Sequence, residues 1–244
     1  MTDANAAVQD ALASLAASRT VVVPAAERVA DRIRAEVAEA RLRVGARLPE
    51  QALGAALQVS RNTVREALSQ LVAERVLIRV PNRGVFVAQP EADDIRDVYS
   101  ARLVIEPGAI RYGARAADPA ALSAVRAAYR EGRGAAEVGD WTGVAAANQH
   151  FHRDVVALAG SPRLEREMGR LLAEMRLVFQ RMPQVREFHE PYLDRNGEIA
   201  AMLTDGHVEK AADELARYLV AARDQLLDAY ARLPGGTGPA TPGR

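Results

Sequence analysis

Cysteine is absent from this 244-residue chain, which excludes disulfide bonds, thiolate metal sites and cysteine nucleophiles. The chain also lacks any apolar run near the roughly 20 residues that a membrane span requires, so we expect no membrane partner. Residues 1–18 contain no basic segment of the kind that opens a secretion signal. With 49% hydrophobic and 26% charged residues, the composition is that of an ordinary globular protein, which we expect in the cytoplasm.

The chain has no net excess of charge of either sign, but its charges are unevenly distributed. Residues 19–90 contain 12 arginines and 7 acidic residues, whereas residues 91–244 are mildly acidic. A basic first third predicts that this part of the chain contacts a polyanion such as nucleic acid. The count alone is equally compatible with chance, so the sequence motifs must decide between the two.

The first third has the pattern of three helices followed by a β-hairpin. Apolar residues recur at helical spacing in 24–42, and shorter helices are expected at 49–57 and 60–74. Two runs rich in β-branched residues, 76–80 and 85–87, then flank a turn of proline, asparagine, arginine and glycine. This order of elements predicts a winged helix-turn-helix.

The remainder has helical periodicity to near the end of the chain, with breaks at proline, glycine and capping residues. The spacing predicts an all-α antiparallel bundle with helices at 93–117, 119–138, 140–159, 162–182, 190–204 and 207–232. The predicted fold is therefore mainly α. Its parts are a flexible N-terminal extension at 1–18, a winged helix-turn-helix domain at 19–88, a linker at 89–98, an all-helical domain at 99–232 and a disordered tail at 233–244.

A helical wheel divides the segment 60–71 into two faces. Apolar side chains form one stripe, which we expect to face the core. The adjoining face carries polar side chains that suit contacts with bases: Arg61, Asn62, Thr63, Arg65 and Ser69. Arginine can bind guanine, and asparagine adenine, through two hydrogen bonds in the major groove. A solvated amphipathic helix has the same pattern, but the hairpin that follows favours DNA binding.

The motifs of this part resemble those of the GntR family of bacterial transcription regulators. The family typically reads L-x-E-x-x-LA and then VSR-x-x-VREAL; this chain has LPEQALG at 48–54, VSRNTVREAL at 59–68 and the wing RVPNRGVFV at 79–87. The resemblance covers about residues 24–88. It implies a DNA-binding domain with contacts from the recognition helix, from the wing and from one residue ahead of both, namely Arg61, Thr63, Arg65, Asn82, Arg83, Gly84 and Arg47.

The helical remainder resembles the FadR-type branch of that family, whose C-terminal FCD domain is a helical bundle that senses small molecules. Three stretches carry the resemblance: 98–106, which contains the opening R-x-x-x-E helix; 148–164, which is similar to D-x-x-FH followed by a GNP-L turn; and the closing helices at 197–223. The resemblance implies that residues 99–232 bind an effector and form a dimer.

Many members of that branch hold a divalent metal with an aspartate, a histidine four residues later and two histidines from the last two helices. At those positions this chain has Asn148, His152, Asn196 and Tyr218, so His152 alone of the implied ligands remains. A neutral amide and a protonated phenol are weak ligands for zinc or nickel. We therefore expect no metal cofactor, with zinc, nickel or manganese on His152 as the alternative.

The other histidines do not restore the metal set. His150 lies about 200° around the helix from His152, so the two cannot face one ion. His189 is expected in the loop before the helix at 190–204, and His207 just after a turn, so both are candidates for the surface.

A metal-free pocket suits a polar or anionic effector. Arg102 is the candidate clamp for a carboxylate, because its planar fork makes two parallel hydrogen bonds. Asn148, His152, Asn196 and Tyr218 would add uncharged donors and acceptors. Two alternatives remain open: Arg102 forms a salt bridge with the acidic residue four positions later, and His152 is a satisfied core histidine.

Catalysis is not expected, because the chain has no glycine-rich phosphate loop, no G-x-S-x-G elbow and no H-E-x-x-H helix. We predict a sequence-specific transcriptional regulator that acts as a repressor rather than as an activator. It would bind a palindromic double-stranded operator as a homodimer, with its affinity controlled by a small-molecule metabolite. A metal-dependent carboxylate sensor of the same family and an effector-independent DNA-binding protein are the alternatives.

Overall fold

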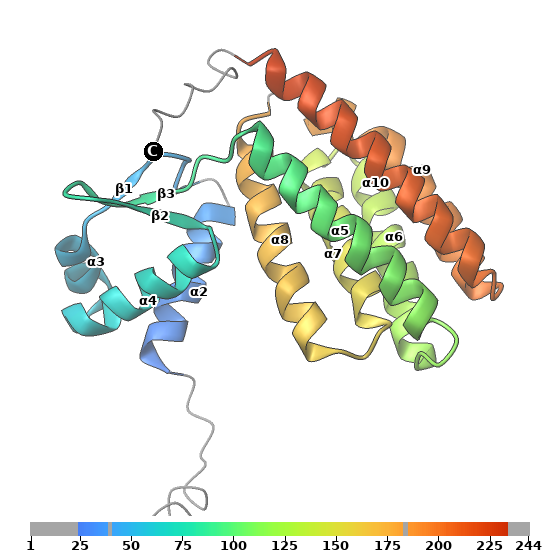
Figure 1. The fold of residues 1–244 in the computed structure, drawn as a ribbon, viewed down its shortest axis with the longest axis horizontal. Coiled ribbons are helices and arrows are strands. Elements are labelled where there is room, and N and C mark those ends of the chain that lie inside the picture. The colour runs from blue at the N-terminus through green and yellow to red at the C-terminus, as the bar shows by residue number, and fades with distance from the viewer. Residues whose placement is uncertain (1–23, 39–40, 183–184, 234–244) are drawn as a thin grey trace, which may run out of the picture.

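The computed structural model describes residues 24–38, 41–182 and 185–233, and it begins with a winged helix-turn-helix (Figure 1). The predicted extension at 1–18 and almost all of the predicted tail lie outside these residues. The three strands form one antiparallel sheet in the order β1-β3-β2. The elements of this part are α2 (Ala25–Ala38), β1 (Arg47–Leu48), α3 (Glu50–Leu57), α4 (Arg61–Ala73), β2 (Leu77–Val80) and β3 (Gly84–Val87).

Six helices follow and pack into a separate bundle, as Figure 1 shows. They are α5 (Ala92–Gly113), α6 (Pro119–Glu137), α7 (Trp141–Ala157), α8 (Pro162–Gln180), α9 (Val185–Thr204) and α10 (Val208–Ala231). The predicted fold class, a winged helix-turn-helix followed by an all-helical part, is confirmed. None of the helices in the described residues combines the length and the apolar character that crossing a membrane requires.

Two features differ from the sequence prediction. The hairpin gains a third, two-residue strand, because Arg47 pairs with Phe86 and Leu48 with Val85. In addition, α9 begins at Val185 rather than at residue 190, and it contains Pro191. A proline in a helical pattern usually marks a first turn, which is why its position suggested a later start.

Each part has its own hydrophobic core, and α8 contributes to both. Met175 packs in the core of the bundle, whereas Leu177 is fully buried in the core of the winged helix-turn-helix. Gln180 also donates a hydrogen bond to the carbonyl of Val37, in the last turn of α2. The helix α8 therefore joins the two parts (Figure 1).

Candidate DNA-binding surface and effector pocket

The recognition helix α4 begins at a capping serine. The Ser60 hydroxyl accepts a hydrogen bond from the Thr63 backbone N–H at 3.1 Å and lies 2.8 Å from the Thr63 hydroxyl. The apolar stripe of the helix is buried, as expected. Arg61, Asn62 and Arg65 are exposed on its other side. The helix thus offers the predicted polar side chains to solvent, where a DNA groove would meet them.

Arg65 is held in place by the neighbouring helix α3. Its Nε lies 2.8 Å from Glu50 Oε2, and Arg79 of β2 approaches the same carboxylate at 3.9 Å. The Arg65 side chain is 66% exposed, so opening this ion pair costs little free energy. A phosphate or a base edge can therefore replace Glu50 as the partner of Arg65.

The predicted wing contacts gather at the exposed tip of the hairpin. Asn82 has φ +59° and Gly84 has φ +109°, in the left-handed region that asparagine and glycine adopt at low cost. A Cβ at Gly84 would lie 3.5 Å from Arg47 Nε, so the Arg47 side chain runs beside the tip. The Arg83 guanidinium lies over the Phe86 ring, 5.8 Å from its centre. The wing tip therefore exposes Arg47, Asn82 and Arg83, side chains suited to contacts with phosphates.

Four of the predicted pocket residues meet in one buried network. Asn148 and His152 come from α7, Asn196 from α9 and Tyr218 from α10. Asn148 Oδ1 accepts hydrogen bonds from Asn196 Nδ2 at 2.8 Å and from the Tyr218 hydroxyl at 3.0 Å. The same hydroxyl lies 3.1 Å from His152 Nε2. A molecule bound at this point would contact three helices at once.

Arg102 and Glu106 extend the network into α5. Arg102 Nε donates to Glu106 Oε1 at 2.6 Å, and Glu106 Oε2 lies 2.6 Å from His152 Nδ1. Burial lowers the pKa of His152, so the ring is neutral near pH 7 and donates its Nδ1–H to Glu106. Burial opposes the charge of Glu106, but Arg102 and His152 together outweigh this effect and lower the pKa of the carboxyl. Arg102 therefore forms the salt bridge that was its alternative role, and only part of its fork remains for a ligand.

The network has hydrogen-bonding capacity that the protein does not use. Among the described residues, Arg102 Nη2 and Asn196 Oδ1 are buried without a partner. The Tyr218 hydroxyl has one proton for two acceptors, Asn148 Oδ1 and His152 Nε2. A cavity of about 10 Å³ lies among these groups, enough for the centre of about one water molecule. The pocket is closed around an incompletely bonded polar cluster.

His189 is buried beside this cavity, so the predicted position in a surface loop is wrong. It lies in the second turn of α9 and is 2% exposed. Its ring packs against Phe179 and Phe188, with ring centres 4.9 and 5.0 Å apart, and both phenylalanines also line the cavity. Burial lowers the pKa of His189 to about 4, and neither ring nitrogen has a hydrogen-bond partner. The residues around His189 do not indicate that it is buried. It is buried because α9 begins at Val185, which places His189 on the helix rather than in a loop.

The donor set does not fit the divalent metal that the resemblance implies. Both ring nitrogens of His152 already have partners, and the other three residues at the implied ligand positions are uncharged. No group of three or more histidine, aspartate or glutamate side chains within the described ranges is placed to hold an ion. His150 points away from His152 and pairs with Glu131 at 3.0 Å, while His207 is exposed before α10.

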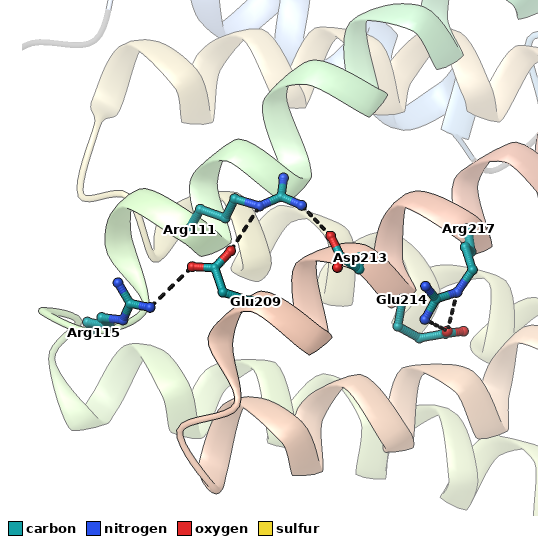
Figure 2. Close-up of polar contacts among 6 residues, drawn as sticks. All are labelled: Arg111, Arg115, Glu209, Asp213, Glu214 and Arg217. Carbon is teal, nitrogen blue, oxygen red and sulfur yellow. Dashed lines mark hydrogen bonds and ion pairs between the residues drawn. The ribbon is translucent and has the colours of Figure 1, made fainter.

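A ladder of ion pairs joins α5 to α10 on the outer face of the bundle (Figure 2). Arg111 lies 2.6 Å from Asp213, and Arg115 lies 3.1 Å from Glu209. Each step toward the end of α5 is thus a step back along α10, so the two helices are antiparallel. Glu209 also accepts a hydrogen bond from Arg111, so it links the two ion pairs of the ladder.

The same register places exposed apolar residues of α5 and α10 at the same level along the two helices. About two turns before the Arg111–Asp213 pair, Val104 of α5 is level with Val220 of α10. Val104 is 75% exposed and Val220 39%, and Tyr112, two turns after Val104, is 83% exposed. This face of α5 and α10 is hereafter the outer face.

Two family models match the chain. The model of bacterial regulatory proteins of the gntR family matches residues 25–87, and the FCD domain matches residues 97–221. The first range covers the winged helix-turn-helix, and the second covers nearly all of the helical bundle. The chain belongs to the GntR family. This GntR-family protein is a transcriptional regulator with a DNA-binding domain and an FCD ligand-binding domain, and not an enzyme, which confirms the predicted class and the FadR-type branch.

Individual relatives agree with this assignment. A crystal structure described as a transcriptional regulator GntR from Rhodococcus sp. RHA1 is 41% identical, covers 84% of this chain and 98% of that chain, and has a TM-score of 0.77. A protein of Paenarthrobacter nicotinovorans named "Probable D-xylose utilization operon transcriptional repressor" is 31% identical over 72% of this chain and 79% of its own length. The regulator BphR of Paraburkholderia xenovorans is 28% identical over 79% of this chain and 85% of its own length.

Proposed function

We propose that this GntR-family regulator is a cytoplasmic homodimeric repressor whose operator affinity is set by a small anionic metabolite, bound without a metal ion. The effector site is the buried cluster of Arg102, Asn148, His152, Asn196 and Tyr218. The observation that carries the proposal is the unused hydrogen-bonding capacity of this cluster. Each unpaired buried polar group costs about 1–3 kcal/mol, which a ligand that completes the cluster recovers. A repressor of Paenarthrobacter nicotinovorans among the relatives supports the sign of regulation.

The lining of the cavity indicates the kind of effector. Polar groups of Arg102, Asn148 and His152 lie among the lining, and the remaining wall is largely aromatic and apolar, with Phe179 and Phe188 among its side chains. Because Glu106 occupies Arg102 Nε, the unpaired Nη2 is the part of the fork that can donate hydrogen bonds to a carboxylate. This pattern suits a monocarboxylate with an apolar or aromatic body. Since the cavity of about 10 Å³ has room for only about one water molecule, the effector must displace side chains of the lining, such as Phe179 and Phe188, as it enters.

A route from this pocket to the DNA-binding domain runs through α8. Leu172, Met175 and Phe179 of this helix line the cavity, while Leu177 is part of the core of the winged helix-turn-helix. An effector that pushes on the first three side chains also moves the fourth. The effector then favours the arrangement of the two domains that best admits it, at the expense of the arrangement that fits the operator.

Thermal denaturation with benzoate, 4-hydroxybenzoate, L-lactate and succinate tests the effector site. We expect an aromatic monocarboxylate to raise the melting temperature of the wild-type protein. Tyr218→Phe removes one hydroxyl of the cluster and should weaken that binding roughly tenfold. Tyr129→Phe, at a tyrosine of α6 that does not line the cavity, is the matched control and should bind as the wild type does. Equal binding by both variants contradicts the assignment of the pocket.

The outer face of α5 and α10 is the surface that we assign to the second copy. This face combines exposed apolar side chains (Val104, Tyr112 and Val220) with the ladder of arginine and acidic residues. In a two-fold dimer the same face of both copies meets, so apolar groups can pack together and arginines can pair with acidic residues of the other copy. Light scattering with Val104→Asp tests this assignment, and Val138→Asp, at an exposed valine after α6, is the control. We expect monomers for the first and dimers for the second; dimers for both would contradict it.

A further inference from the structure

A cleft of about 220 Å³ lies between the two domains, and it shares only Gln149 and Leu172 with the lining of the effector pocket. The helix α2 of the winged helix-turn-helix contributes Arg34 and Val37, and α7 contributes His150 and Arg153. The helix α8 forms the remaining wall, on which Arg176 lies. The cleft is therefore built by both domains, and whatever binds in it contacts both.

The lining of this cleft is strongly cationic. Three guanidinium groups and one imidazole reach it, and among its described lining residues none is acidic. Arg34 pairs with Asp31 and Glu74, Arg153 with Asp154 and His150 with Glu131, and these carboxylates stand outside the lining. The positive groups therefore line the cleft itself, while the carboxylates that pair with them lie around it.

Among the cationic side chains of the cleft, Arg176 differs from the others because its hydrogen-bond partner is uncharged. Its Nε donates to Gln149 Oε1, a neutral amide. Within the described part of the chain, no carboxylate lies within ion-pair distance of its guanidinium. Burial lowers the pKa of Arg176, and no nearby acid offsets this effect. Arg176 is thus an exposed cation without a carboxylate partner, so an anion that enters the cleft can pair with it.

The cleft also reaches the recognition helix. Arg34 Nε and Nη2 lie 2.8 and 2.9 Å from the two carboxylate oxygens of Glu74, the residue that ends α4. An anion in the cleft competes with Glu74 for Arg34. Such binding loosens the contact between α2 and the end of α4, while Arg153 and Arg176 hold the same anion against the bundle.

We propose that this interdomain cleft is a second ligand site, which binds a small dianion with a phosphate group or two carboxylates through Arg34, Arg153 and Arg176. Planar guanidinium forks match both kinds of anion, and 220 Å³ admits a metabolite of a few carbon atoms with its charged group. The site acts on the contact between the domains, so its occupancy changes operator affinity through Arg34 and Glu74 rather than through the buried polar cluster.

Calorimetric titration of the full-length protein with inorganic phosphate, and in parallel with succinate, tests the proposal at constant ionic strength set by chloride. We expect saturable binding of at least one probe, with phosphate and succinate distinguishing the two kinds of dianion. Arg176→Gln should weaken it roughly tenfold, whereas Arg166→Gln, an exposed arginine of α8 outside the cleft, should leave it unchanged. The proposal is overturned if neither probe binds saturably, or if both variants bind the probe equally well.

A second measurement uses the wild-type protein alone, so it does not depend on whether a variant folds. Phenylglyoxal modifies accessible arginines of the wild-type protein, and mass spectrometry locates the adducts. We expect the bound dianion to protect Arg153 and Arg176 while Arg166 reacts as before. Uniform reaction of all three, with and without the probe, also overturns the site. Because Tyr218→Phe lies outside the cleft, it should bind the probe normally, which separates this site from the effector pocket.

Discussion

Glu174→Gln tests the description of the junction between the domains. Glu174 lies on α8 and is 8% exposed, near Arg75 of the turn after α4 and near Asp94 and Asp97 of α5. Burial raises the pKa of this carboxyl from an ordinary value of 4.5 to about 7; Arg75 opposes the shift, and Asp94 and Asp97 add to it. The folded protein therefore holds this proton more tightly than the unfolded chain does.

The sign and size of the effect follow from the difference in proton binding. The contribution of Glu174 to the free energy of unfolding is most favourable below pH 4.5, where both the folded and the unfolded states carry the proton. It falls as the pH rises to about 7, where the folded state also loses the proton. One pKa unit corresponds to 1.36 kcal/mol, which sets an upper limit of about 3 kcal/mol above pH 7. Glutamine carries no charge at any of these pH values. We expect Glu174→Gln to be more stable than the wild type by about 1–3 kcal/mol at pH 8 and nearly equal to it at pH 4.5.

Denaturant unfolding followed by circular dichroism at pH 4.5 and pH 8 measures this difference. Glu198→Gln is the matched control, because it replaces an exposed glutamate in the middle of α9. The control should change the free energy of unfolding by less than about 0.5 kcal/mol at both pH values. A Glu174→Gln variant that is no more stable than the wild type at pH 8, or equally stabilised at both pH values, would refute the reasoning.

Three further substitutions test other parts of the structure. Arg65→Ala should weaken specific DNA binding by about 1–3 kcal/mol in fluorescence anisotropy while leaving effector binding unchanged, and an unaltered operator affinity would remove this residue from the interface. Gly113→Ala would place a Cβ 2.1 Å from the Leu158 carbonyl oxygen and should lower the melting temperature, whereas Gly134→Ala, with open space around it, should raise stability by up to about 1 kcal/mol; the reverse order would contradict the helix packing. Glu106→Gln leaves a buried arginine without its counter-charge and should cost about 3–5 kcal/mol in denaturant unfolding, so a loss below about 1 kcal/mol would contradict the buried ion pair.

Local patterns were enough to predict the DNA-binding half. The cap at Ser60, the apolar stripe of α4 and the turn between the β-branched runs depend on residues near one another in sequence. The strand β1 was missed because a two-residue strand has no periodicity of its own. It exists only because Arg47 and Leu48 meet β3, which lies far along the chain.

The pocket could be predicted only in part. The resemblance brought Asn148, His152, Asn196 and Tyr218 together correctly in space, but it did not show how their hydrogen bonds are shared. The spacing of Arg102 and Glu106 allowed a free clamp and a salt bridge alike, and a buried pair is decided by what surrounds it. Burial of His189 depended on where α9 begins, and the proline in that helix concealed it.

Selection of binding sites from a random double-stranded DNA library, with the full-length protein, tests the central claim most directly. We expect an enriched inverted repeat whose half-sites are about one helical turn apart, because two recognition helices of a dimer read one face of the duplex. Arg61→Ala and Arg65→Ala should lose this enrichment. Enrichment of a single half-site, or of no sequence at all, would contradict a dimeric regulator that reads its operator through α4 and the wing.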